Sequence, residues 1–304
     1  MAARAVSVAW QRAAASLIER VNKQAASSSD ARPDHLYHFT DCAGLIGIFE
    51  TKTLWASLAT SLNDPSEVRY GIDLACALLR RKDVTARNFS LQDMEERIAT
   101  RADESRAYVI SFCKNLNLAG QWLHYGRSGS GVALGFYPDR MTQPPFDLFR
   151  ILYRHDEQVD AIRLIVRSAD QTLDELLPEV GDESQRNRLK DIAVDLTADH
   201  LWMASPRFKH PSFEAEEEWR LIAHELRGPG APFGEGPAGA TQFRTSGGRV
   251  VPYKKLKFET LPAFEVILGS SCPMGPSDLG LLVLMEDRLG ARLTTRRSEV
   301  PVRP

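Results

Sequence analysis

Short runs of apolar residues, alternating or continuous, recur along the chain between polar turns, which is the pattern of β-strands. Gly247-Gly248 separates two such runs and predicts a hairpin turn. The predicted strands are Leu36–Thr40, Thr53–Ser57, Tyr108–Cys113, Gly131–Phe136, Leu148–Tyr153, Glu218–His224, the arms of the hairpin Phe243–Tyr253, Phe264–Leu268 and Ala291–Arg297.

Between these strands, apolar residues three and four positions apart predict helices. Asp41 is placed to cap the first of them, at residues 43–52. The other helices are predicted at residues 68–81 and 90–104, twice within 156–203, and at 277–289. An amphipathic helix is also predicted at residues 5–23, with an apolar face made of Val6, Trp10, Ala13, Leu17 and Val21.

The order of these elements predicts an α+β fold. Strands and helices alternate without the regular β-α-β rhythm of a doubly wound sheet, and no strand is followed by a GxGxxG or GxxxxGK[ST] loop. Residues 25–33 are small and polar and predict a linker. We therefore predict an N-terminal helix and linker over residues 1–33, and a single α+β domain over 34–304 with helical insertions near 68–104 and 156–203.

Composition narrows the class of protein. Of the 304 residues, 43% are hydrophobic and the formal net charge is −2, so the total charge does not imply attraction to nucleic acid or to an anionic membrane. The four cysteines form no CxxC pair, which argues against a zinc site or a disulfide framework. No apolar run reaches the roughly 18 residues of a membrane span. We expect a cytoplasmic protein with reduced cysteines, no metal and no membrane partner.

Two carboxylates at the start of a strand are the strongest candidates for chemistry. Glu216, Glu218 and Arg220 share one face if the strand begins early enough. Two carboxylates on one face are costly unless that face is wet or a cation lies there. One of them can accept a hydrogen bond from a ribose hydroxyl and stabilise an oxocarbenium-like charge. The alternative is a solvated acidic cap in which Arg220 pairs with a glutamate.

A histidine and several aromatic residues are further candidates. On a strand, His38 and Thr40 point to one face, which we expect to be a cleft or solvent, and Tyr37 and Phe39 point to the other, which we expect to be core. For a lone histidine, the alternative is a hydrogen-bonded structural residue.

Ser111 ends a strand, and Trp122 and Tyr125 follow it on one side of a helical turn. Such a pair can stack on a flat ring such as nicotinamide, although its commoner role is in the core.

Together these segments resemble a known family. The series LYHFT, LWAS, LNDPSE, SFCKN, QWLHYG, KHPSFEAEEEWRL and EVILGSSC is similar to the bacterial domain-of-unknown-function 2971 family, over roughly Leu36 to Met285. The motifs are specific in combination and weak singly, and the family label supplies no function.

A looser resemblance concerns the opening LYHFT, the helix with GLIGI and the strand that follows. This order is similar to the start of ADP-ribosyltransferase-like domains, which include DNA-modifying toxins of toxin–antitoxin systems. The resemblance implies a mixed β core of two small packed sheets, NAD as substrate, and a role in phage defence or as a toxin. The superfamily's middle motif is not cleanly present.

Carried over residue by residue, the resemblance implies that His38 holds the adenosine side of NAD and that Tyr125, or its rival Trp122, stacks on nicotinamide. Glu218 would contact the nicotinamide ribose, and Glu216 would orient or deprotonate an acceptor that is protein, DNA or RNA. The expected NAD-binding residues are His38, Thr40, Ser111, Trp122 and Tyr125, and the expected catalytic residues are Glu218 and Glu216.

Two other functions remain open. One is a non-catalytic ligand-binding or sensor protein on the same fold, in which His38 and Glu218 serve structure or recognition. The other is a nuclease or hydrolase that binds a metal ion through Asp64, Glu67, Glu216 and Glu218. The transferase requires His38 and Glu218 to face each other across one groove.

Overall fold

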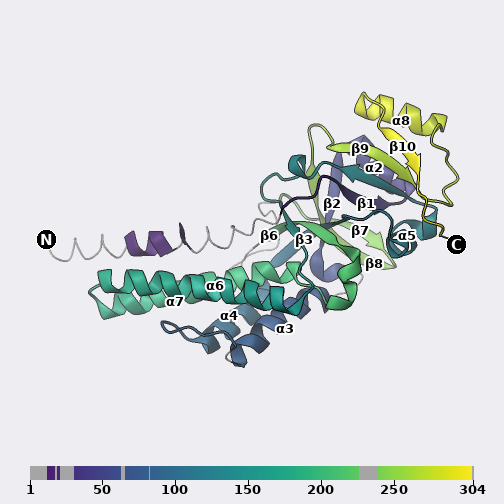
Figure 1. The fold of residues 1–304 in the computed structure, drawn as a ribbon. Helices are drawn as coiled ribbons and strands as arrows, with labels where there is room; N and C mark the ends of the chain where they lie inside the picture. Colours follow the sequence, from purple (N-terminus) through teal and green to yellow (C-terminus); the bar gives the residue numbers. More distant parts are fainter. Residues whose placement is uncertain are drawn as a thin grey trace.

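A ten-stranded mixed sheet with helices on both faces forms the body of the chain in a computed structural model (Figure 1). This sheet confirms the predicted α+β class. The structure describes residues 12–17, 19–20, 31–62, 66–81, 83–225 and 238–302. Val6, Trp10 and Val21 of the predicted N-terminal apolar face lie outside these residues.

The strands follow the order β10-β9-β4-β1-β3-β2-β8-β7, and β6 pairs with β3 and β5. Their positions agree with the predicted strands to within a few residues. The bounds are β1 Leu36–Thr40, β2 Thr53–Leu58, β3 Arg106–Cys113, β4 Val132–Phe136, β5 Asp147–Arg150, β6 Glu218–Glu225, β7 Gln242–Ser246, β8 Arg249–Lys257, β9 Ala263–Leu268 and β10 Thr294–Arg297.

The sheet forks at β3. Strand β6 pairs along the whole of β3, so β1 and β2 share the other edge. Strand β1 pairs near the end of β3, where Tyr37 lies opposite Cys113, whereas β2 pairs near its start, where Ser57 lies opposite Val109. The two small packed sheets that we predicted are therefore one hydrogen-bonded sheet, because β3 joins both halves.

Helices α2 (Cys42–Thr51) and α8 (Leu279–Leu289) cover one face of the sheet, here called the α2 face. Asp41 caps α2 as predicted, since its carboxylate accepts a 2.7 Å hydrogen bond from the Gly44 amide. The main apolar core lies on this face and joins both helices to side chains of the sheet. Its members include Leu36, Leu45, Phe49, Phe112, Leu134, Trp219, Val266, Leu281 and Met285.

The opposite face, here called the α5 face, is covered by α5 (Ala119–His124) near β1 and by the end of α7 (Glu183–Ala204) near β6. Trp122 of α5 packs with Phe39 and Ala133 of the sheet. Trp202 of α7 packs with Val109 and Ile222. The candidate site lies on this face, where the strand register places Glu218 between the two contact areas.

A second layer of helices extends from the sheet (Figure 1). It contains α3 (Ser66–Arg80), α4 (Leu91–Glu104), α6 (His155–Leu176) and α7, in the two regions predicted to be helical insertions. Ala13 and Leu17 pack against α6 and α7, in agreement with their predicted apolar face. No helix in the described ranges has both the length and the apolar character needed to cross a membrane.

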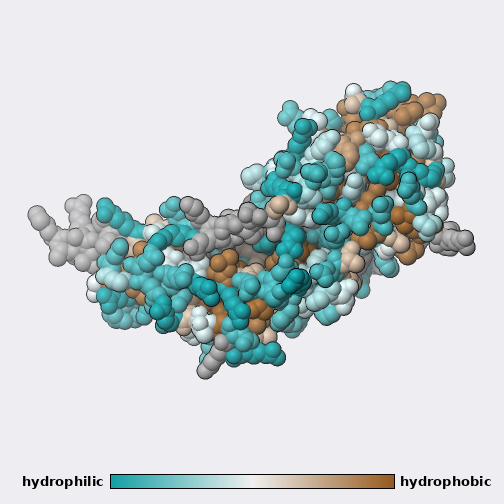
Figure 2. Space-filling model, in the orientation of Figure 1, coloured by the Kyte–Doolittle hydropathy of each residue, from teal (hydrophilic) through white to brown (hydrophobic). Residues whose placement is uncertain are grey.

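Hydrophilic residues cover much of the face shown in Figure 2, with hydrophobic areas over the sheet, on α8 and within the helical layer. Leu279 and Val283 of α8 are exposed. All four cysteines are free thiols, as predicted, and Cys76, Cys113 and Cys272 are buried.

Candidate functional site

The two candidate carboxylates belong to a buried network of ion pairs. Glu218 is only 6% exposed, and its oxygens accept two bonds from Arg220, at 2.7 Å from Nε and 2.9 Å from Nη2. Lys209 Nζ lies 3.1 Å from Glu218 Oε2 and 2.6 Å from Glu216 Oε2. The cation that two neighbouring carboxylates require is therefore present, and it is a lysine side chain.

Further contacts complete the surroundings of Glu218. Its backbone amide donates to the Tyr153 hydroxyl at 3.0 Å, and the Ser111 hydroxyl donates to its carboxylate. Burial raises the pKa of Glu218, but the charges of Arg220 and Lys209 outweigh burial and hold the pKa at about 2. The carboxylate is thus ionised and fully engaged by protein groups.

His38 and Glu218 do not share a groove. The strand register places Tyr37, Cys113 and Glu218 on the α5 face, and His38, one residue along β1, on the α2 face. There the His38 ring lies 5.6 Å from the Phe112 ring. The convergence expected across a groove is therefore wrong, because strand β3 lies between the two side chains.

Ser111 nevertheless connects these residues. Its carbonyl accepts a 3.0 Å hydrogen bond from His38 Nδ1, and its hydroxyl donates to Glu218 on the other face. A carbonyl can only accept, so the bond fixes the tautomer with the proton on Nδ1. The arrangement matches the structural alternative for a lone histidine. The expected cleft on the His38 side is instead the face of the main core, with His38 half-buried there.

The aromatic candidates separate into a core residue and a surface residue. Trp122 is 0% exposed, donates from Nε1 to the Leu116 carbonyl at 3.0 Å and meets the Phe39 ring edge-on. It has no face left for nicotinamide. Tyr125 is 41% exposed, just after α5. Thr40 pairs with Val132 at the end of β1.

Of the four carboxylates proposed for a metal site, the structure describes the side chains of two, Glu216 and Glu218. Among the described residues, no group of three or more histidine, cysteine, aspartate or glutamate side chains is placed to hold a metal ion. Glu216 and Glu218 are engaged by Lys209, as described above. Asp64 and the side chain of Glu67 lie outside the described part of the chain.

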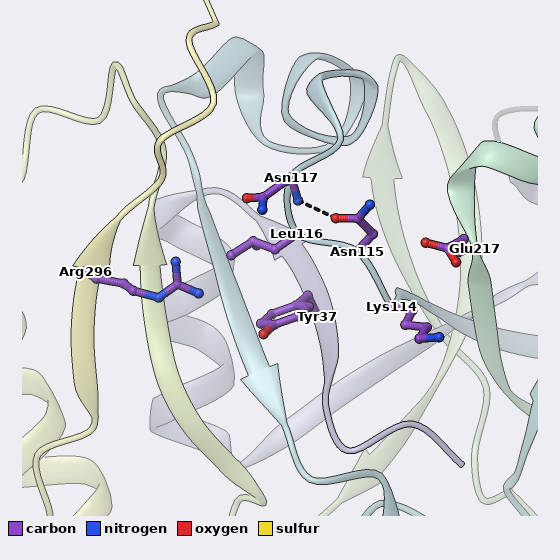
Figure 3. A pocket seen from close by; sticks show the side chains of 7 residues that line it. All are labelled: Tyr37, Lys114, Asn115, Leu116, Asn117, Glu217 and Arg296. Carbon is purple, nitrogen blue, oxygen red and sulfur yellow. Dashed lines mark hydrogen bonds between the residues drawn. The ribbon is translucent and has the colours of Figure 1, made fainter. Parts of the chain in front are cut away.

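A polar pocket of about 410 Å³ opens on the α5 face, beside the buried network (Figure 3). We call it the Tyr37 pocket. Tyr37 comes from β1 and Arg296 from β10, whereas the remaining residues come from the loop after β3 and the turn before β6. The lining residues are Tyr37, Lys114, Asn115, Leu116, Asn117, Glu217 and Arg296.

The side chains of the Tyr37 pocket supply donors, acceptors and both signs of charge (Figure 3). Lys114 is exposed and forms no ion pair with any described residue, whereas Arg296 Nε binds Glu265 at 2.9 Å. Burial raises the pKa of Tyr37, so its hydroxyl stays protonated at neutral pH and donates to Glu265. The pocket therefore offers hydrogen-bonding groups and one cation that is free to bind an anion.

The turn before β6 carries backbone strain at the edge of this pocket. Glu217 has a positive φ of 44°, which is unfavourable for a residue other than glycine. Its carbonyl accepts a 3.2 Å bond from the Lys114 amide, which ties the turn to the end of β3. Such strain is often found at functional sites. At this turn, the positive φ of Glu217 directs its exposed side chain to the Tyr37 pocket. The side chain of the next residue, Glu218, lies in the buried ion-pair network.

Comparison with known families assigns the middle of the chain. Residues 121–221 match the family model described as protein of unknown function (DUF2971). This segment supports the resemblance to the DUF2971 family over about a third of the chain. The searches of curated proteins and of solved structures found no match. The matched DUF2971 segment contains Lys209, Glu216, Glu218 and Arg220, but of the residues that line the Tyr37 pocket it contains only Glu217.

Sequence reasoning missed most of the Tyr37 pocket. Tyr37 was assigned to the core because it alternates with His38, and Arg296 was assigned only to a strand. One usable signal was present: Lys114, Asn115 and Asn117 form a polar cluster directly after a buried strand. Loops at strand ends often carry binding residues.

Acid should destabilise this protein because burial favours the neutral form of three of its histidines. Burial lowers the pKa of His224 from 6.5 to about 4, and it also lowers the pKa values of His38 and His200. The unfolded chain regains ordinary histidines and binds more protons, so the free energy of unfolding falls as pH drops from about 6.5 toward 4. His224 alone should account for about 2–3 kcal/mol.

Urea denaturation between about pH 7 and pH 4.5 would measure this fall. His224→Gln should flatten the curve in that interval, because glutamine does not titrate. An unfolding free energy that stays constant or rises on acidification would contradict the assignment.

Proposed function

We propose that this chain is a ligand-binding protein that recognises a small polar molecule with an anionic group in the Tyr37 pocket. One observation carries the proposal: Lys114 lies at a pocket lined by amide and hydroxyl groups and pairs with no described acid. A pocket of about 410 Å³ falls within the range of small-molecule sites. The ammonium would hold the anionic group, while Asn115 and Asn117 would bind neighbouring hydroxyl or amide groups.

The chemistry of the lining favours binding without catalysis. Glu217 is the sole carboxylate among the residues that line the pocket, and no histidine, cysteine or serine accompanies it there. Lysine and tyrosine can also act as general acids or bases, but among the described residues no side-chain hydrogen bond joins Lys114 or Tyr37 to the Glu217 carboxylate. The carboxylates on either side of it in the chain, Glu216 and Glu218, are both engaged by Lys209, and Glu218 is also engaged by Arg220.

NAD is the first ligand to test. Its diphosphate provides the anionic group that Lys114 would bind, and its ribose hydroxyls and nicotinamide amide suit the asparagine side chains. ADP-ribose and ATP share the phosphates and ribose but lack nicotinamide, so their affinities would show which part of the molecule is recognised.

ADP-ribosyl transfer from NAD stays the second candidate only without the shared groove that it was expected to need, because His38 and Glu218 lie on opposite faces of the sheet. One observation favours it: Ser111 hydrogen-bonds to both His38 and Glu218, so three of the predicted site residues lie in one chain of contacts. Transfer to a protein or nucleic-acid acceptor, and with it a role in defence or as a toxin, would then require the ion pairs of Glu218 to open when substrate binds.

Calorimetric titration with NAD, ADP-ribose and ATP tests the binding proposal. Lys114→Ala should weaken binding by about 10- to 100-fold, because one charge-assisted hydrogen bond is lost. Lys190→Ala, on α7 and outside the pocket lining, is the matched control and should bind like the native chain. Equal binding by native protein and Lys114→Ala would refute the assignment of the pocket.

Release of nicotinamide, measured with labelled NAD with and without cell extract, tests the transferase separately. The binding proposal expects no release. Release that disappears in Glu218→Gln, in a variant that is still folded by circular dichroism, would establish the transferase in its place.

A further inference from the structure

Strands β2, β8 and β7 carry an aromatic and basic surface that is separate from the Tyr37 pocket. The register places the paired residues Trp55 and Lys255, and Ser57 and Tyr253, on the same face of these strands. Arg244 lies opposite Val251, two residues from Tyr253, and so shares that face. We call this surface the Trp55 patch; it consists of Trp55, Arg244, Arg249, Tyr253, Lys255 and Lys257.

The aromatic part of the Trp55 patch is a fixed, partly exposed ring. Trp55 is 43% exposed, although it lies in a strand between neighbours that are buried. Its ring stacks on buried Tyr253, with centroids 4.5 Å apart and planes 25° apart. The stack holds the indole in place from below, so little side-chain entropy would be lost when a flat ligand lies on the outer side.

The charge of the patch has one sign. Strands β2, β7 and β8 contain no aspartate or glutamate, and the acids nearest in sequence, Glu50 and Glu259, lie outside them. Arg249, Lys255 and Lys257 are exposed, and Arg244 is half-buried. None of these four cations forms an ion pair with a described residue; Arg244 instead donates from Nη2 to the Ser57 hydroxyl at 3.0 Å. A local basic surface thus exists despite the net charge of −2.

The spacing of these cations suits an extended polyanion. Arg249 and Lys257 lie at opposite ends of β8, and a strand of that length spans about 27 Å. Cations along a groove or sheet contact successive phosphates, and exposed aromatic rings stack on bases, in proteins that bind single strands. A duplex would offer phosphates to the cations but no unstacked base to Trp55.

We propose that the Trp55 patch binds single-stranded nucleic acid, with a base stacked on Trp55 and phosphates bound by Lys255, Lys257 and the two arginines. This inference does not depend on the ligand of the Tyr37 pocket. It supplies a partner for the cations of the Trp55 patch. The same chemistry fits RNA and DNA, and the experiment separates them.

Fluorescence anisotropy with labelled 15-nucleotide uridine and thymidine homopolymers, at about 50 and 200 mM salt, tests the proposal. Binding should weaken as salt rises. Trp55→Ala should weaken it about 5- to 100-fold, whereas Trp55→Phe should retain most of the affinity. The variant with Lys255→Glu and Lys257→Glu should also lower the salt dependence, by about 0.7 in log–log slope for each lost phosphate contact.

Matched controls lie on the helical layer. Leu164→Ala removes an apolar side chain that is 55% exposed on α6, and Lys190→Glu reverses a charge on α7. Both controls should bind like the native chain, and circular dichroism melting should show that every variant is folded. A preference for one homopolymer would identify RNA or DNA as the partner.

Three results would overturn the proposal. The first is no binding at about 50 mM salt, where electrostatic contacts are strong. The second is binding that Trp55→Ala and the double lysine variant leave unchanged, or duplex binding that is as tight as single-strand binding. The third is a concentration-dependent dimer in sedimentation experiments that Trp55→Ala dissociates, which would assign the patch to a second copy of the chain.

Discussion

Replacing Glu218 by glutamine should lower the free energy of unfolding by about 3–5 kcal/mol, the usual cost of removing one partner from a buried ion pair. Glu218 is 6% exposed and holds both Arg220 and Lys209. The neutral amide removes the carboxylate that two buried cations share, and Glu216 and the Pro206 carbonyl are acceptors that remain. The free energy of unfolding therefore falls mainly because positive charge is left uncompensated, and less because a hydrogen bond is missing.

Urea denaturation at neutral pH measures the effect, and Glu217→Gln is its matched control. Glu217 is the adjacent residue and takes the same substitution, but its side chain is exposed. Its variant should stay within about 0.5 kcal/mol of the native chain. If the two variants are equally stable, the ion pairs of Glu218 do not stabilise the fold. A role of Glu218 in a functional site then becomes the better explanation.

The Glu218 carboxylate also makes the free energy of unfolding depend on pH in a second, more acidic interval. Its pKa is lowered from 4.5 to about 2, so its contribution is complete above about pH 4.5 and is lost as the pH falls from there toward 2. This interval lies below the one in which His224 titrates. Glu218→Gln should consequently remove the lower part of the pH dependence and leave the upper part unchanged.

Truncation of Trp122 to alanine should cost about 3–5 kcal/mol, because the ring is fully buried and the change opens a large cavity. The indole also donates to the Leu116 carbonyl and packs edge-on against Phe39. Both contacts hold α5 and the loop after β3 against β1. Since Leu116 lines the Tyr37 pocket, the variant should also bind the pocket's ligand more weakly.

Tyr125→Ala is the control for this prediction. Tyr125 lies three residues after Trp122 and is 41% exposed, so its removal should change the free energy of unfolding by no more than about 0.5 kcal/mol. Thermal or urea unfolding of both variants makes the comparison. A stable Trp122→Ala variant with impaired NAD binding would return Trp122 to the role of a ligand-stacking residue.

The sequence by itself determined the local elements. Apolar spacing located α2, α8 and most strands to within a few residues, and Asp41 identified the start of α2, because periodicity and helix caps depend on near neighbours. The pairing of Arg220 with a glutamate was also foreseen as an alternative, since the two residues alternate along one strand. The family followed from motifs that extend along the chain and was confirmed for residues 121–221.

Only the tertiary structure decided which residues meet. Lys209 reaches Glu218 from a separate turn, and the Tyr37 pocket combines β1, the end of β3 and β10, which are far apart in sequence. Adjacent strand residues point to opposite faces, so the pairing of Tyr37 with Cys113 was enough to place His38 away from Glu218. That register depends on packing across the whole sheet, so the pattern of residues along one strand does not predict it.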